Sequence, residues 1–170
     1  AGYIADTGNA SFSVVKVAGD DGVETWRFRA PSTYGIARSL AVDAAGNVVA
    51  AGEISVIPAV VALTAGGSLR WQKPIAGISR GTATGLAIDA EGDAVAIGER
   101  TSPSGMNAFA VRLAAADGGE RWRYSPATPR DRLQAITLLP DGDPVLTGAA
   151  QVAEDQSSRQ DFSVTRLDAL

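Results

Sequence analysis

The sequence repeats one spacing of glycine and tryptophan three times along its 170 residues. In each copy a Gly stands four positions before a Trp, and an apolar pair begins 14 or 15 residues after that Trp. A second Gly closes each copy, twelve residues beyond the first member of the pair. The first glycines and their tryptophans are Gly22 and Trp26, Gly67 and Trp71, and Gly118 and Trp122; the closing glycines are Gly52, Gly98 and Gly148. A period of 45 to 51 residues made of short strand-like runs is typical of β-propeller blades.

Each copy contains four short segments. Segment A holds the apolar pair, segment B ends at the closing Gly, segment C is rich in β-branched and aromatic residues, and segment D surrounds the Trp. Their ranges are 40–43, 86–89 and 136–139 for A; 48–51, 94–97 and 144–147 for B; 12–17, 59–63, 108–113 and 162–167 for C; and 24–28, 69–73 and 120–124 for D. A Gly recurs in the A–B and C–D links, which predicts tight antiparallel hairpins. The expected fold is all-β, a partial propeller ring of four-stranded antiparallel blades with about 3.5 repeats.

We expect a single propeller segment over 1–170, with full blades at 38–76 and 84–125 and partial blades at 1–30 and 133–170. A closed ring needs at least about four blades. Two arrangements would supply the rest: further blades on a longer polypeptide, which we favour, or copies of the chain that close the ring as a homo-oligomer. The B–C loop varies most, because the closing Gly and the end of segment C are 15, 11, 15 and 19 residues apart. Variable loops lie on the surface and often carry recognition.

Composition excludes several functions. The net charge of −4 disfavours nucleic-acid binding, because neutralising phosphates needs a basic face. No apolar run approaches the ~18 residues of a membrane span. The chain has no Cys and no His, which removes thiol nucleophiles, Cys/His zinc sites and the Ser-His-Asp triad. Carboxylate or Lys chemistry remains open, and no cofactor is expected.

The segments read Phe-Ser-Val-Val-Lys-Val at 12–17 and Phe-Ala-Val-Arg-Leu at 109–113, each followed by an Asp-Gly turn and a Trp. This pattern resembles the bacterial β-propeller repeats of the SBBP type. It is also similar to the PQQ-like blades of quinoprotein dehydrogenases and of the outer-membrane assembly scaffold. In the quinoprotein family, Gly four residues before Trp and an acidic residue two before it form a tryptophan-docking motif. Glu24 and Glu120 match the acidic position, and Leu69 departs from it.

That resemblance implies tryptophans that lock adjacent blades together. Trp26, Trp71 and Trp122, with Gly22, Gly67 and Gly118, would form these locks. A stacked quinone or sugar is the alternative role for the three rings. The vicinal Cys pair that lies against the quinone in those dehydrogenases is absent here.

Arginines in the D–A connection are the candidate binding residues. Arg38, Arg80, Arg130 and Arg132 would form an anion site if they converged near the central channel. Their offsets before segment A are irregular, which favours solvated or blade-bridging side chains instead. Arg38, Arg80 and Arg132 remain the binding candidates.

Three other patterns have simpler explanations. Asp89, Glu91, Asp93, Asp141 and Asp143 offer oxygens to Ca²⁺, but hairpin turns demand the same residue types, so no metal site is expected. A basic residue recurs in segment C as Lys16, Arg112 and Arg166, with Ala62 as the exception, which indicates a solvent-facing strand position. The triplet Asn9-Ala10-Ser11 is a glycosylation sequon that matters only in a eukaryotic secretory setting.

The function expected from these observations is that of a non-catalytic propeller module. It would act as a protein-interaction scaffold in a bacterial extracytoplasmic or cell-surface assembly, with a protein or further blades as its partner. Two alternatives stay open: a fragment of a PQQ-like quinoprotein dehydrogenase, and a carbohydrate-binding propeller lectin.

Overall fold

The structure is a computed structural model that describes residues 2–6, 9–32, 34–103, 105–126, 130–151 and 160–167, with side chains from Ala10 onward. Within these ranges every regular element is a strand, which confirms the all-β prediction. The strands are β1 (Gly2–Asp6), β2 (Asn9–Val17), β3 (Glu24–Arg29), β4 (Gly35–Val42), β5 (Val48–Ile54), β6 (Ile57–Leu63), β7 (Leu69–Pro74), β8 (Gly81–Ile88), β9 (Ala94–Ser102), β10 (Gly105–Leu113), β11 (Glu120–Tyr124), β12 (Arg132–Leu138), β13 (Pro144–Gln151) and β14 (Gln160–Arg166).

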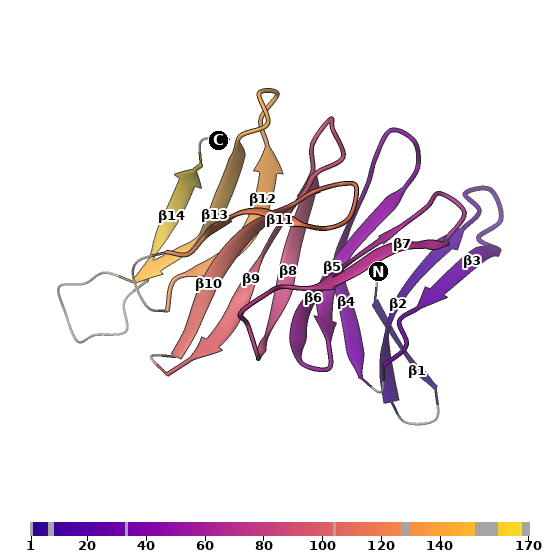
Figure 1. Ribbon diagram of the computed structural model, residues 1–170, viewed down its shortest axis with the longest axis horizontal. Coiled ribbons are helices and arrows are strands. Elements are labelled where there is room, and N and C mark those ends of the chain that lie inside the picture. The colour runs from indigo at the N-terminus through magenta and orange to yellow at the C-terminus, as the bar shows by residue number, and fades with distance from the viewer. Residues whose placement is uncertain are drawn as a thin grey trace.

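The strands form four antiparallel sheets in which each strand pairs with its neighbour in sequence. The first sheet contains β1 to β3, the second β4 to β7, the third β8 to β11 and the fourth β12 to β14. They lie side by side in chain order, as Figure 1 shows. Segment A forms β4, β8 and β12, and these strands follow one another in space, since β4 contacts β8 and β8 contacts β12.

The closing glycine of each repeat is explained by a bulge in the strand beside it. The register of the A strand shifts between Ala37 and Ser39 in β4, and the same shift occurs in β8 and β12. A Cβ on Gly52 would lie only 1.9 Å from the carbonyl oxygen of Ile36, and Gly98 and Gly148 meet equivalent oxygens at 2.1 and 1.8 Å. Only glycine fits opposite such a bulge.

The core lies between the sheets rather than inside any one of them. The largest cluster joins the second and third sheets, and it includes Val49, Val60, Trp71, Leu86 and Phe109. A second cluster around Phe12 and Val14 joins the first sheet to the second, and a third joins the third sheet to the fourth. Small alanines fill the centres of β5 and β9, which lets the sheets approach closely.

Candidate functional site

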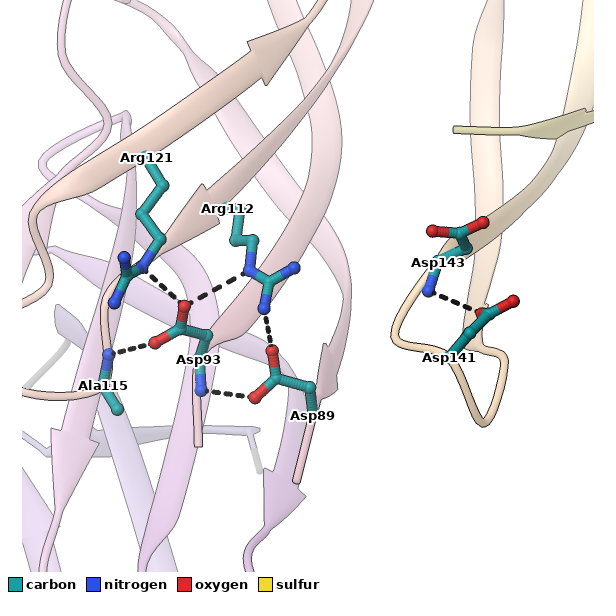
Figure 2. Close-up of polar contacts among 7 residues, drawn as sticks. All are labelled: Asp89, Asp93, Arg112, Ala115, Arg121, Asp141 and Asp143. Atoms are coloured by element: carbon teal, nitrogen blue, oxygen red, sulfur yellow. Dashed lines mark hydrogen bonds and ion pairs between the residues drawn. The ribbon is translucent and has the colours of Figure 1, made fainter. Parts of the chain in front are cut away.

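A network of charged residues closes one end of the third sheet, where the hairpin between β8 and β9 meets the start of the C–D hairpin. The Arg112 guanidinium pairs with the carboxylate of Asp89, and its Nε lies 3.3 Å from Oδ2 of Asp93. Arg121 adds a second contact to the same Asp93 oxygen, at 2.6 Å. Figure 2 shows the four side chains converging on this corner.

Apart from Arg121, whose side chain is 57% exposed, the network is shielded from water. The side chain of Arg112 is 14% exposed, and those of Asp89 and Asp93 are 3% and 7% exposed. The interpretation of the basic position in segment C as solvent-facing is therefore wrong for Arg112. The cause is the acidic turn beside it, because carboxylates at Asp89 and Asp93 give a buried arginine its counter-charges.

Asp93 also links this corner to the neighbouring sheet. Its Oδ1 accepts the backbone N–H of Ala115 at 2.9 Å, as drawn in Figure 2. The carbonyl of Ala115 in turn accepts the indole N–H of Trp71, from the second sheet, at 2.9 Å. The hairpin carboxylate thus fixes the peptide on which the preceding sheet's tryptophan docks.

The second sheet repeats this relay with an amide in place of the second carboxylate. Asn47 stands at the position of Asp93, and its Oδ1 accepts the backbone N–H of Ala65 at 3.2 Å. The Ala65 carbonyl accepts the indole N–H of Trp26 at 3.0 Å. Asn47 is held by Asp43 through its side-chain amide and its backbone N–H, both at 2.8 Å. These bonds hold the pKa of the Asp43 carboxyl below its usual range, with the Asn47 side chain as the main cause.

The glycine of each docking pair leaves room for a tryptophan ring. Gly67 and Gly118 have φ of +84° and +71°. A Cβ on Gly67 would come within 2.6 Å of the Trp26 ring, and one on Gly118 within 2.7 Å of the Trp71 ring. We call each such glycine, with the carbonyl that receives the indole N–H, a tryptophan seat. The structure thus brings Trp26 to Gly67 and Trp71 to Gly118, across adjacent sheets.

Trp122 and Gly22, at the two ends of the series of tryptophans and glycines, do not form a filled seat of this kind among the described residues. The indole nitrogen of Trp122 is buried with no acceptor among the described residues. Gly22 has φ of +73°, yet a Cβ there would meet nothing within 4 Å.

The acidic turns serve the hairpins themselves. Arg166 pairs with Asp143 and lies 2.9 Å from Asp141, while the backbone N–H of Asp143 donates to Asp141 at 3.1 Å. A hollow of about 390 Å³ separates this turn from the turn at Asp89 and Glu91. Within the described part of the chain, no group of three or more acidic residues is placed to hold a metal ion.

The candidate arginines lie at the other end of the strands, away from the A–B hairpins. Arg38 donates to Thr82 Oγ1 at 2.8 Å and lies 3.5 Å from the buried carboxylate of Glu53. Arg132 lies 3.8 Å from Glu99, the residue at the Glu53 position in the third sheet. Arg80 is exposed in the connection between the second and third sheets. Arg38 and Arg132 thus bridge neighbouring sheets.

Backbone hydrogen bonds join the B–C turns and D–A connections into one continuous edge. Ser55 N–H donates to Tyr34, Gly81 N–H to Val56, and Thr101 N–H to Arg80, each at 2.9 Å. We call this edge, formed by residues 34, 55–56, 80–81, 101 and 106, the B–C rim. Tyr34, Val56 and Met106 are exposed apolar side chains on it, at 37%, 43% and 36%. Sequence reasoning missed them, because single exposed apolar residues carry no spacing signal.

The sequon Asn9-Ala10-Ser11 lies at the start of β2, and the side chain of Asn9 falls outside the described ones. Throughout the described ranges, no helix is long and apolar enough to cross a membrane.

Comparison with known proteins defines the fold. No protein-family model matches the chain, and no curated protein matches it. Among solved structures, the chain is similar to the WD40 domain of Pan2 from Neurospora crassa, with a TM-score of 0.59 and 13% identity over 92% of this chain. The match spans 44% of that chain, less than half of its length. The four sheets are therefore a segment of a β-propeller, as the repeat spacing predicted.

Proposed function

We propose that this chain is part of a non-catalytic propeller that binds a protein partner through its B–C rim. The exposed apolar side chains of Tyr34, Val56 and Met106 on one continuous edge carry the proposal. Aromatic residues and methionine are enriched in protein–protein interfaces. The similarity to a WD40 propeller supports the same class of module at the level of the fold.

The two-residue turn at Ser55 and Val56 adds a local argument. Both residues have positive φ, +52° and +63°. A turn of this kind favours Asn-Gly, and a β-branched residue in the left-handed region is strained. Strain kept at an exposed position supports a role in contacts outside the chain, because Asn or Gly would relieve it.

The buried charged groups support a structural rather than a catalytic role. Glu53 accepts from Tyr34 Oη at 3.0 Å and faces Arg38, while Asp89 and Asp93 face Arg112. Each of these carboxylates already stabilises a contact within or between sheets. The resemblance to bacterial propeller repeats supports placing the scaffold in an extracytoplasmic assembly.

Site-specific photo-crosslinking in the source cells tests this proposal. A photo-reactive amino acid at Val56 is expected to capture one defined protein, whereas the same residue at Ala44, exposed on the opposite hairpin side, captures none. Val56→Asp should abolish a matching crosslink from Met106 without lowering the melting temperature, since Asp tolerates positive φ better than Val. Equal capture from Val56 and Ala44, or none from either, would contradict the proposal.

A further inference from the structure

The first sheet carries a tryptophan seat that no described side chain fills. Gly22 N–H donates to the Ala18 carbonyl at 3.0 Å, as Gly118 N–H does to Ala114 at 2.9 Å. The two turns therefore match, which makes Gly19 the counterpart of Ala115, whose carbonyl receives an indole N–H. Gly22 has the same left-handed conformation as the filled seats, but open space where a ring lies in them. Val17 and Val23 are exposed beside it.

Among the described residues, Lys16 on the first sheet also lacks the carboxylate partner that its counterparts have. Lys16 pairs in register with Trp26, as Arg112 does with Trp122, so it occupies the Arg112 position. Arg112 and Arg166 each bind a carboxylate of the A–B hairpin in their own sheet. Lys16 is exposed, and the described part of its sheet contains no A strand. A carboxylate is thus the expected partner of Lys16.

One continuous segment would satisfy both groups. In the three repeats the Trp precedes the closing Gly by 26 or 27 residues, and Asn47, Asp93 and Asp143 precede it by five. Gly2 is the closing glycine of the first sheet, because it pairs with Ser13 as Gly52 pairs with Ala59. A segment of this length joins the outer strand of one sheet to the second strand of the next.

We propose that the open face of the first sheet is the docking site of a segment directly preceding Gly2 on the same polypeptide. It carries a Trp 26 or 27 residues ahead of Gly2, whose ring lies on Gly22 and whose indole N–H donates to the Gly19 carbonyl. It also carries an Asp or Glu five residues ahead of Gly2, which pairs with Lys16. Its A strand lies against the free edge of β1.

A second copy of this chain does not fit the same place. Trp26 and Trp71 are docked on Gly67 and Gly118 of their own chain. Trp122 packs within the cluster that joins the third and fourth sheets. None of these rings is available to Gly22 without taking apart an interface that already exists.

The direct test is the intact mass and amino-terminal sequence of the polypeptide as its source cells make it. The expected result is a chain that extends past Gly2 with Trp and the acidic residue at the stated distances. A polypeptide that begins at Ala1, or that lacks either residue there, overturns the proposal.

Glycine substitutions in that native polypeptide test the contact itself. Gly142 has φ of +88° with nothing within 4 Å of a Cβ, so Gly142→Ala measures backbone strain alone. Gly22→Ala should lower the melting temperature about two to three times as much, because a methyl group would also displace the ring. In the 170-residue chain, Gly22→Ala and Gly142→Ala should lower the melting temperature by the same amount. Equal decreases in melting temperature for the two variants of the native polypeptide would overturn the proposal.

Lys16→Gln is the second variant, and it does not alter the backbone. It should lower the melting temperature of the native polypeptide and leave that of the 170-residue chain unchanged. An unchanged value in both contradicts the predicted ion pair. Neither measurement uses a binding partner, so its outcome is separate from that of the crosslinking at Val56.

Discussion

The A–B hairpins of the two central sheets share one backbone and differ in their chemistry. In the second sheet Asp43 accepts the backbone N–H of Asn47, and in the third Asp89 accepts that of Asp93, both at 2.8 Å. Ala62 stands where the third sheet has Arg112, so Asn47 lacks that arginine contact. Asp93, by contrast, contacts two arginines.

The comparison of these two hairpins indicates that the fold requires a side-chain oxygen at the position of Asn47 and Asp93, whether charged or not. Both hairpins deliver a side-chain oxygen to the next backbone N–H, at Ala65 or Ala115, and both of these peptides receive a tryptophan. The charge is one of two ways to hold that oxygen. The carboxylate of Asp93 is held by an arginine in segment C, whereas the amide of Asn47 is held by Asp43 without one, so the two positions differ together between these two sheets.

The largest expected loss of stability comes from removing the arginine of the charged corner in the third sheet. Arg112→Ala leaves the buried carboxylates of Asp89 and Asp93 without their main counter-charge. We expect a loss of about 3–5 kcal/mol in the free energy of unfolding, since uncompensated buried charges are costly. Urea denaturation at pH 7 measures it.

A double variant can give the hairpin of the third sheet the same residues as that of the second and so test whether the two are equivalent. Adding Asp93→Asn to Arg112→Ala recreates the neutral pair of Asn47 and Ala62 at that corner. We expect the double variant to recover at least about half of the stability lost in the single one. A double variant no more stable than Arg112→Ala would show that the two hairpins are not equivalent.

A smaller loss of stability is expected from removing the amide of Asn47 in the second sheet. Asn47→Ala removes the acceptor of the Ala65 N–H and the amide that donates to Asp43. We expect a loss of about 1–3 kcal/mol, because a partly buried backbone donor loses its partner. The indole N–H of Trp26 should then exchange faster with solvent while that of Trp71 stays unchanged, which NMR can resolve. Equal acceleration at both would argue for global loosening.

The smallest effect is the contribution of Asp43, in the second sheet, to the pH dependence of stability. The Asn47 side chain holds the pKa of Asp43 below its unfolded value, so the carboxylate stabilises the fold above the unfolded pKa. That contribution is lost as pH falls through the lower, folded pKa. Asp43→Asn should therefore lose less stability on acidification from about pH 6 to pH 3 than the unchanged chain does. An equal loss in both proteins would contradict this assignment.

The sequence predicted the fold because its repeat reports backbone needs directly. Gly52 lies opposite a bulge and Gly67 beneath a tryptophan ring, and neither place accepts a Cβ. The need opposite the bulge recurs at Gly98 and Gly148 and the need beneath the ring at Gly118, so both become visible as spacing. The burial of Arg112 could not be predicted, because the sequence pattern of a basic residue on a strand is the same whether its side chain faces water or a buried carboxylate. The B–C loop was predicted as a recognition element, but its exposed apolar residues Tyr34, Val56 and Met106 were not, since the arrangement of the sheets places them on one edge.

Neighbouring blades are locked by a tryptophan of one and a hairpin peptide of the next. Hydrogen exchange of the indole N–H groups, followed by NMR, tests it most directly. The indoles of Trp26 and Trp71 should exchange as slowly as the most protected backbone amides, because they donate to Ala65 and Ala115. Exchange of either at the rate of a free indole would contradict the account.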